Sequence, residues 1–388
     1  MRWRPIDFFA LLPVLTFSVS YGLTTDFKGF YHRLGVLCLD WAAPYMFARS
    51  VLRTPAALTR LLRSIAFSAT LLAFFAVYEC RMATRILALL WHQLVPTLDV
   101  LPHLGYWRWG FMRAVATFGE PIALGVFFAT ATLLACAWAS IEPRRARAAL
   151  FACTACLAGC IATLSRGPIA SVVAVLLGYW AVTRKRWILV AVLLGIAAVA
   201  APFVVDFAKR VLVDTQTDLT VSGNTSSGQY RLALFLIYGK SIADVSFFGD
   251  PTLVGAEYEQ AWSLDNSYLY LLILGGWVGG GSFLGVLGVN LFRSGALVLR
   301  TEERRRKTYG ALLAGHIAIV VSMTDVWFSP TFAPLFWLTM GLIAFPDDAL
   351  GRGMGRPAHA GTTQRNTMSP GQRQSGSLRP LTQQTREM

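Results

Sequence analysis

The chain has 388 residues, of which 55% are hydrophobic and only 14% are charged, and its net charge is +14. A water-soluble domain needs more charged surface than this, so the composition excludes an ordinary soluble protein. The basic excess does not indicate nucleic-acid binding, because the charges stand in short clusters between long apolar blocks, where membrane topology already requires them. We therefore expect a protein whose solvent is the lipid bilayer.

The apolar blocks have the length of membrane-spanning helices. Only helices or a closed barrel satisfy every backbone polar group in hydrocarbon, and blocks of ~16–22 residues fit helices rather than ~10-residue barrel strands. The sequence predicts an all-α polytopic membrane protein, with a membrane-embedded domain over 1–346 and a polar, disordered cytoplasmic tail over 347–388. We expect ten spans, at about 5–23, 33–48, 64–79, 119–140, 149–164, 168–183, 187–207, 267–292, 308–325 and 331–346.

Two of these spans are irregular. The second is interrupted by Asp40 and Pro44. The eighth, over 267–292, is longer than a bilayer requires, and we expect it to begin as a short surface helix before it crosses.

Small residues mark helix faces that we expect to pack closely. The eighth span contains Gly276-x3-Gly280 and Gly281-x3-Gly285, a spacing far more typical of helix packing than of nucleotide binding. Cys153, Cys156 and Cys160 share one helix face, and we interpret them as packing residues because no acidic or histidine partner flanks them.

The loops between the predicted spans differ in their basic content. Of the 35 Lys and Arg residues, 24 fall on the side that carries both termini. The positive-inside rule makes that side the cytoplasm, so we expect a bacterial inner-membrane protein with both termini inside. Arg49, Arg53, Arg60 and Arg63 share a helical face on that side and are expected to anchor on anionic headgroups.

Two outer, periplasmic segments are long, at 80–118 and 208–266. The first contains ILALLWHQLV, which predicts an interfacial helix, and the aromatic run GYWRWGF. The second contains QYRLALFLIYGKSIA, which has the apolar spacing of a helix face, with Arg231 within its first turn.

Outer-side arginines form the first candidate site. Arg113, Arg166 and Arg231 each adjoin an apolar segment, and each could be an interfacial arginine that reaches lipid headgroups. Arg166 fits that explanation least, because the positive-inside rule disfavours a charge in so short an outer turn, 165–167. Guanidinium groups bind phosphate in bidentate fashion, so the three arginines would suit a diphosphate at the outer surface.

Asp265 and Asn266 form the second candidate site, immediately before the eighth span. As structural residues they are helix N-caps, which the residues alone favour. As chemistry, a carboxylate beside a cationic pocket could accept a proton from an attacking hydroxyl. The sequence contains no phosphate-binding, zinc or His-Glu-x-x-His motif, so we expect no cofactor and no metal.

Four segments between about 108 and 292 resemble the O-antigen polymerase and ligase superfamily in order and spacing: RAVATFGEP, LSRGPIASVVAVLLGYW, SSGQYRLALFLIYGKSIADVSFFGDP and DNSYLYLLILGGWVGG. This superfamily includes exopolysaccharide polymerases. The resemblance implies a metal-independent membrane glycosyltransferase that uses an undecaprenyl-diphosphate-linked saccharide. It also implies that Arg166 and Arg231 hold the diphosphate, with Arg113 matched less closely. Ligases of the superfamily usually carry His-Asn where this chain has Asp265-Asn266, so a polymerase is favoured over a ligase.

Two alternatives stay open: a ligase that transfers a finished glycan to another acceptor, and a secondary transporter. Transporters bury ionisable residues near the membrane midplane, whereas only Asp7, Asp40 and His316 lie clearly within spans here. His316 is interpreted as a packed polar residue. The expected partners of a polymerase are the lipid-linked saccharide, membrane lipids, a flippase and a chain-length regulator.

Overall fold

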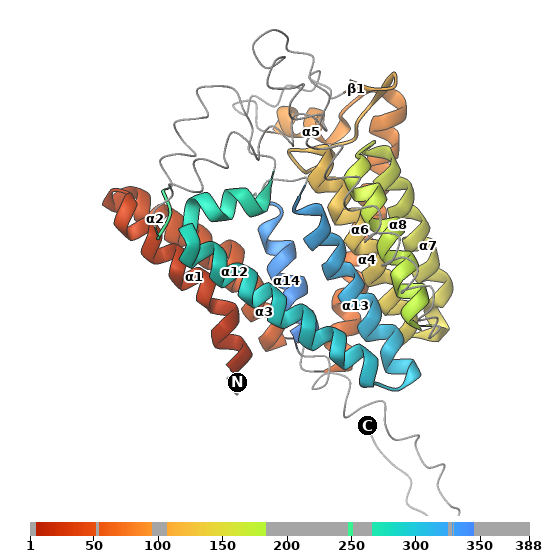
Figure 1. The fold of residues 1–388 in the computed structure, drawn as a ribbon. Coiled ribbons are helices and arrows are strands. Elements are labelled where there is room, and N and C mark those ends of the chain that lie inside the picture. Colours follow the sequence, from red (N-terminus) through yellow and green to blue (C-terminus); the bar gives the residue numbers. More distant parts are fainter. Residues whose placement is uncertain are drawn as a thin grey trace, which may run out of the picture.

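The computed structural model describes residues 5–51, 54–94, 107–183, 247–250, 266–324, 328 and 330–344. These residues are mostly helical, as predicted (Figure 1). Five of their helices are long and apolar enough to cross a membrane, which supports an all-α membrane protein. They are α1 (Pro5–Thr24), α4 (Pro55–Met82), α6 (Pro121–Ile141), α7 (Ala146–Ala162, preceded by the 3-10 turn η2, Pro143–Arg145) and α12 (Ser267–Arg300).

Four further predicted spans coincide with helices that are shorter, interrupted or charged at one end. The seventh predicted span, 187–207, lies outside the described residues. The second predicted span is divided among three consecutive helical segments, because a π-helical turn that contains Asp40 interrupts it. The elements are α2 (Phe27–Val36), π-helix η1 (Leu37–Ala42), α3 (Ala43–Val51), α8 (Arg166–Thr183), α13 (Glu303–Ser322) and α14 (Ala333–Ala344).

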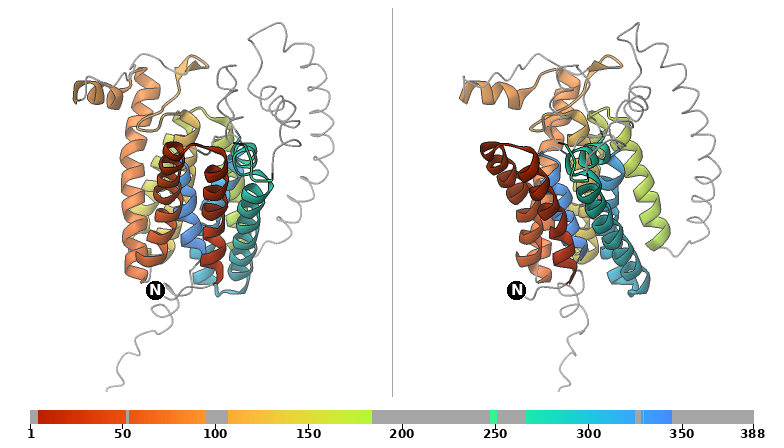
Figure 2. Two further views of the ribbon diagram at one scale, coloured as in Figure 1. Left: turned by 90° about the vertical axis from the view of Figure 1, so that its left-hand side faces the viewer. Right: turned by 60° about the vertical axis from the view of Figure 1, so that its left-hand side comes forward.

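The predicted outer segment 80–118 contains the expected helix and a hairpin that the sequence did not predict. Helix α5 (Ile86–Leu94) covers the ILALLWHQLV stretch and projects from the bundle at the end away from the N-terminus (Figure 2). Strands β1 (Trp107–Arg108) and β2 (Phe111–Met112) pair antiparallel. Their two-residue turn, Trp109-Gly110, has positive φ at both positions, which is the conformation that tight hairpins require.

Helix α6 is the centre of the bundle, with α4, α7 and α13 packed around it. Its residues are buried on every side, which a helix apolar all round permits. Alanines spaced three or four residues apart on α4, such as Ala69, Ala73 and Ala76, are buried in the same cluster as α6 and α7 side chains. Small residues let helix backbones approach closely. In a bilayer, where the hydrophobic effect does not drive helices together, such close van der Waals packing stabilises the contact.

The predicted cysteine packing is also found. Cys153 and Cys160 are buried on α7 and donate to the carbonyl oxygens of Thr132 and Gly125 on α6, at 3.4 and 3.6 Å. Cys156 is buried in the same hydrophobic cluster as Cys160. These thiols are free and serve the contact between α6 and α7.

A second core is aromatic and joins α1, η1, α12 and α14. The Trp41 ring stacks on Trp337 with 5.6 Å between centroids and meets Phe17 edge-on at 5.0 Å. Phe283 and Phe328 complete the cluster. Such offset and edge-to-face pairs add to the free energy gained by burial alone.

Helix α12 is broken at Gly276, where φ is 60° and ψ is −162°. Its first section lies across the bundle and its second runs along it, so the expected short helix before the crossing is present (Figure 1). The break leaves helical backbone groups without their usual partners. The Asp250 N–H donates to Ile273 O at 2.9 Å, and Phe247 O accepts from the Val278 N–H at 3.2 Å.

The glycine pairs expected to pack helices are placed differently from the prediction. Gly275 and Gly279 face Phe17 of α1, and a Cβ at Gly275 would stand 2.6 Å from that ring. Gly276 instead forms the break, while a Cβ at Gly281 or Gly285 would have no atom within 4 Å. The contact between α12 and α1 thus uses Gly275 and Gly279, each one residue before the predicted pair Gly276 and Gly280.

Two of the arginines expected to anchor on headgroups are bound to acidic side chains instead. Arg49 forms two hydrogen bonds to the Asp7 carboxylate, at 2.5 and 2.6 Å, and both side chains are buried. Arg63 pairs with Glu142, which also accepts from the Trp138 indole at 2.7 Å. The anchor prediction is wrong for Arg49, because its helix turns the side chain into the protein toward Asp7; the Arg63 side chain is paired but still 34% exposed.

Candidate functional site

The predicted site residues that the structure describes belong to elements at one end of the bundle. The hairpin, α5 and the first turns of α8 and α12 gather at the end opposite to the N-terminus (Figure 1). Arg113 follows the hairpin, Arg166 begins α8 and Asn266 caps α12. Arg231 and Asp265 lie outside the described residues.

Two arginines hold the turn that precedes α8. Arg113 donates through Nε to Thr163 O at 3.2 Å and through Nη2 to Ser165 Oγ at 2.8 Å. Arg108, on strand β1, donates through Nη1 to Leu164 O at 2.6 Å. Leu164 has a φ of 50°, a left-handed conformation that a leucine adopts only when its surroundings impose it. Arg113 and Arg108 therefore position this turn.

Arg166 is presented by that turn. It is the first residue of α8, its side chain is exposed, and its Cζ lies 5.5 Å from the centroid of the Trp109 ring. The Arg108 guanidinium lies over the same ring at 5.9 Å. Three guanidinium groups thus meet around one turn and one helix N-terminus, an arrangement that attracts anions. We call Arg108, Arg113 and Arg166 the arginine cluster.

Sequence reasoning missed Arg108, Trp109 and also Glu79. Glu79, near the end of α4, is buried, and its Oε2 accepts from the N–H groups of Val115 and Ala116 at 3.0 and 2.9 Å. This carboxylate fixes the backbone immediately after Arg113. The sequence did contain a signal for Glu79: an acidic residue inside a long apolar helix needs a hydrogen-bond or charge partner when it is buried.

Asn266 caps α12 with a fully engaged side chain. Its Oδ1 accepts from the N–H groups of Tyr268 and Leu269 at 3.0 and 3.1 Å, and its Nδ2 donates to Thr324 O at 3.3 Å. The side chain is buried. Of the two roles that the sequence left open for this pair, the cap is therefore the one that Asn266 fills.

The end of α13 connects this cap with α8. The Ser267 N–H donates to Met323 O at 2.9 Å, and Ser322 Oγ lies 3.3 Å from Ser171 Oγ of α8. The start of α12 and the first turns of α8 therefore share one neighbour. Helix α13 thus connects the elements that carry Arg166 and Asn266, one residue from each predicted site.

Removing the cap should weaken the start of α12. We expect Asn266→Ala to lower the free energy of unfolding by about 1 kcal/mol, because two backbone N–H groups lose their acceptor. Asn266→Asp keeps a hydrogen-bond acceptor for both N–H groups, so its free energy of unfolding should be closer to that of the wild type. Thermal unfolding of the purified full chain in detergent checks this order, and equal stability of both variants would contradict the capping role.

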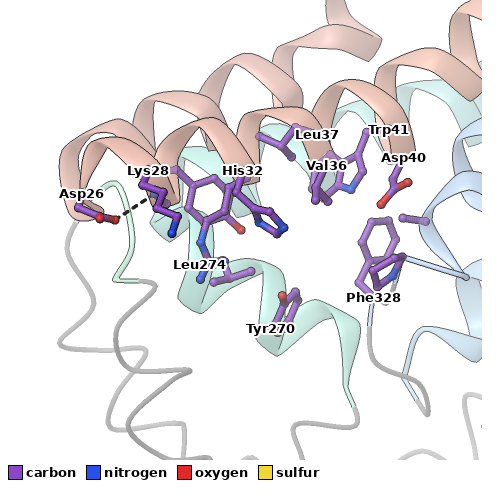
Figure 3. Close-up of a pocket in the computed structure, with 15 residues that line it drawn as sticks. Asp26, Lys28, His32, Val36, Leu37, Asp40, Trp41, Tyr270, Leu274 and Phe328 are labelled. Carbon is purple, nitrogen blue, oxygen red and sulfur yellow. Dashed lines mark hydrogen bonds between the residues drawn. The ribbon is translucent and has the colours of Figure 1, made fainter. Parts of the chain in front are cut away.

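A cavity of about 620 Å³ opens between α2, η1 and the first section of α12. Lys28 and His32 line it on α2, and Asp40 and Trp41 line it on η1 (Figure 3). Arg33 of α2 also belongs to the lining. Tyr270, Leu274 and Phe328 face them from the other side. The aromatic residues belong to or adjoin the second core.

His316 is placed as expected for a packed polar residue. It is fully buried between α13 and α14, where its Nδ1 lies 2.9 Å from Thr339 Oγ1. Its ring also lies 5.1 Å from that of Phe336. Nothing in these contacts connects it with the arginine cluster.

Comparisons with known proteins do not assign the chain to a family. No family model, no curated protein and no solved structure matches it. Over the residues that the structure describes, no group of three or more His, Cys, Asp and Glu side chains is placed to hold a metal ion.

Proposed function

We propose that the protein is a membrane glycosyltransferase that polymerises lipid-linked saccharide repeat units at the outer face of a bacterial inner membrane. The donor would be an undecaprenyl-diphosphate-linked saccharide, and the arginine cluster would bind its diphosphate. The observation that carries this proposal is the meeting of Arg108, Arg113 and Arg166 around the turn before α8.

The arrangement suits a diphosphate leaving group. When the bond between the sugar and the diphosphate breaks, negative charge develops on the diphosphate, and fixed guanidinium groups stabilise it. Arg108 and Arg113 use donors to hold the turn, so Arg166 is the member whose exposed side chain is available to a ligand. In this proposal Arg166 binds the diphosphate. Arg108 and Arg113 hold the turn that positions Arg166, and their charges add positive electrostatic potential.

An acceptor hydroxyl of a second saccharide would attack the anomeric carbon and form the new glycosidic bond. Its proton would pass to a carboxylate, for which Asp265 is our candidate. Asn266, held by α12 and Thr324, fixes the backbone next to Asp265. A rigid neighbour is what a catalytic carboxylate needs, because small displacements of the reacting groups slow a reaction strongly.

A ligase that transfers a finished glycan would use the same diphosphate chemistry and differs only in its acceptor.

The secondary transporter is less well supported. Broken helices of transporters expose carbonyl oxygens to ions, but at the break in α12 Ile273 O accepts from Asp250 N–H and Leu274 O accepts from Ser20 Oγ at 2.7 Å. Protein donors thus already occupy these two oxygens.

Replacement of Arg166 tests the proposal in a strain that lacks the chromosomal gene. We expect Arg166→Ala to reduce high-molecular-weight polysaccharide by about 100-fold, the scale of losing one fixed donor to developing charge. Arg144→Ala removes an exposed arginine of η2, away from the cluster, and should leave the polymer unchanged. Wild-type polymer in Arg166→Ala, at normal protein level in the membrane, would contradict the proposed function.

A further inference from the structure

We propose that the cavity between α2, η1 and α12 is the binding site of the acceptor saccharide, with Asp40 accepting hydrogen bonds from its hydroxyl groups. We call this cavity the acceptor trough. The proposal rests on the proposed function, which supplies the donor site at the arginine cluster but leaves the second substrate without a place.

The trough follows one face of a single helical stretch. Lys28, His32 and Val36 recur at intervals of four residues, and Asp40 continues the series on the π-helical turn, so their side chains lie along one side. Figure 3 shows Asp26 and Lys28 at one end of this row and Asp40 and Phe328 at the other. The cavity volume is in the range of pockets that bind small organic ligands.

Asp40 is the unusual member of the lining. Ionisable residues within membrane helices are rare and mark functional sites by default, and π-helical turns are frequent at such sites. No hydrogen bond or ion pair to the Asp40 carboxylate is formed within the part of the chain that the structure describes. The carboxylate is half-buried and lines the trough, so its acceptor capacity is directed toward a ligand.

The lining favours a sugar over a lipid tail or a free anion. Trp41, Tyr270 and Phe328 line the trough, and Tyr270 is the most exposed of these three rings. Sugar rings have apolar C–H faces that can lie against such a ring. An apolar tail in the trough would bury the Asp40 carboxylate without a hydrogen bond, which is costly. An anion would be attracted by Lys28 but repelled by Asp40. A neutral ligand with apolar faces and hydroxyl edges meets all of these groups favourably.

Cationic groups of α2 can serve the same ligand. Lys28 is exposed, and the Arg33 guanidinium lies 4.8 Å from the centroid of the Tyr21 ring, which holds it in place. Ammonium and guanidinium groups donate hydrogen bonds to hydroxyl oxygens, while Asp40 accepts them. Asp26, beside Lys28, already accepts from the Gly29 N–H. Donors on α2 and the Asp40 acceptor at the far end would therefore orient an asymmetric saccharide.

The position of the trough fits an acceptor site. Tyr270, in its wall, lies one helical turn beyond Asn266, and its N–H donates to Asn266 O at 3.0 Å. Helix α8, which Arg166 begins, contacts the end of α13 through Ser171 and Ser322, and that end of α13 also accepts a hydrogen bond from Ser267, next to the cap. Asn266 thus links the wall of the trough to the helix end that contacts α8, and in this proposal a hydroxyl of the acceptor would meet the anomeric carbon beside it.

The test measures binding of a repeat-unit oligosaccharide, prepared by partial hydrolysis of the strain's own polysaccharide, to the purified full chain in lipid nanodiscs by calorimetry. Asp40→Asn keeps the shape of the side chain and should weaken binding about tenfold or more, because hydrogen bonds to a charged group are lost. Lys28→Ala, on the exposed rim, should weaken it by a smaller factor. Arg166→Ala, outside the trough, should bind the oligosaccharide as the wild type does.

A second titration uses undecaprenyl diphosphate as the probe, for which the expected order is reversed: Arg166→Ala is impaired and Asp40→Asn is not. Loss of lipid-diphosphate binding in Lys28→Ala, with oligosaccharide binding unchanged, would make the trough an anionic-lipid site and overturn the proposal. Unchanged oligosaccharide binding in Asp40→Asn would also overturn it. If Arg166→Ala makes no polymer in either of these cases, the proposed function stands without the trough.

Discussion

Replacement of Asp7 by asparagine is expected to reduce the free energy of unfolding by about 3–5 kcal/mol, the range for breaking a buried ion pair. The Asp7 carboxylate accepts two hydrogen bonds from Arg49 and one from the Tyr45 hydroxyl, at 3.0 Å. None of Asp7 and only 7% of the Arg49 side chain is exposed. The asparagine would remove the negative charge that both of these Arg49 hydrogen bonds reach, at a place where little water can stabilise the guanidinium.

Reversible denaturation of the full chain in mixed micelles measures this loss. Lys307→Gln is the matched control, because Lys307 and Glu303 form an exposed pair at 2.9 Å whose side chains are 46% and 72% exposed. Such a pair contributes about 0.3–0.5 kcal/mol. Asp7→Leu combined with Arg49→Met should recover most of the stability, since neither charge is then buried alone. A loss in Asp7→Asn no larger than that of the control would show that the pair does not hold α1 to α3.

The second large effect is expected at the break in α12. Gly276 has φ 60° and ψ −162°, a region of backbone conformation that is essentially restricted to glycine. Gly249, with φ 86°, packs against it, and a Cβ there would stand 2.5 Å from both Gly276 N and Leu274 O. Backbone atoms cannot move aside as a flexible side chain can. Gly276→Ala and Gly249→Ala should each lower the free energy of unfolding by about 3 kcal/mol, from strain and lost hydrogen bonds.

Because the two glycines are in contact, the double variant should lose less than the sum of the single variants. Gly281→Ala and Gly285→Ala are the controls, since both positions lie in open space on the same helix. Alanine is preferred to glycine within a helix by about 1 kcal/mol, so these variants should be neutral or slightly more stable. Additive losses at Gly249 and Gly276, or equal losses at all four positions, would contradict the docking of 247–250 into the break.

Much of the fold was predictable because hydropathy is a local property. A window of about 20 apolar residues predicts a helix whatever surrounds it, and nine of the ten expected spans coincide with helices in the structure. The boundaries were less predictable. The helix of the second span begins at Phe27, because Asp26 accepts a hydrogen bond from the Gly29 N–H and so caps a turn that lies before the apolar block.

The candidate site was predictable only in part. The sequence marked Arg113 and Arg166 as positive charges on the predicted outer side, where the positive-inside rule disfavours them. It did not indicate that Arg113 would hold the turn that precedes Arg166. It left two roles open for the pair Asp265-Asn266; the hydrogen bonds from Tyr268 and Leu269 show that Asn266 caps the helix, while the catalytic role of the pair remains a prediction. The predictions for Arg231 and Asp265 remain predictions, because both residues lie outside the described ranges.

By itself, the sequence determined that this is a helical membrane protein, because composition and block length depend on no long-range contact. Only the tertiary structure decided which charges meet. Asp7 and Arg49 are 42 residues apart on different helices, and Glu79 meets the backbone of Val115 across 36 residues. Such pairs depend on how each helix is rotated about its axis. That rotation is set by the packing of neighbouring helices, which no single segment encodes.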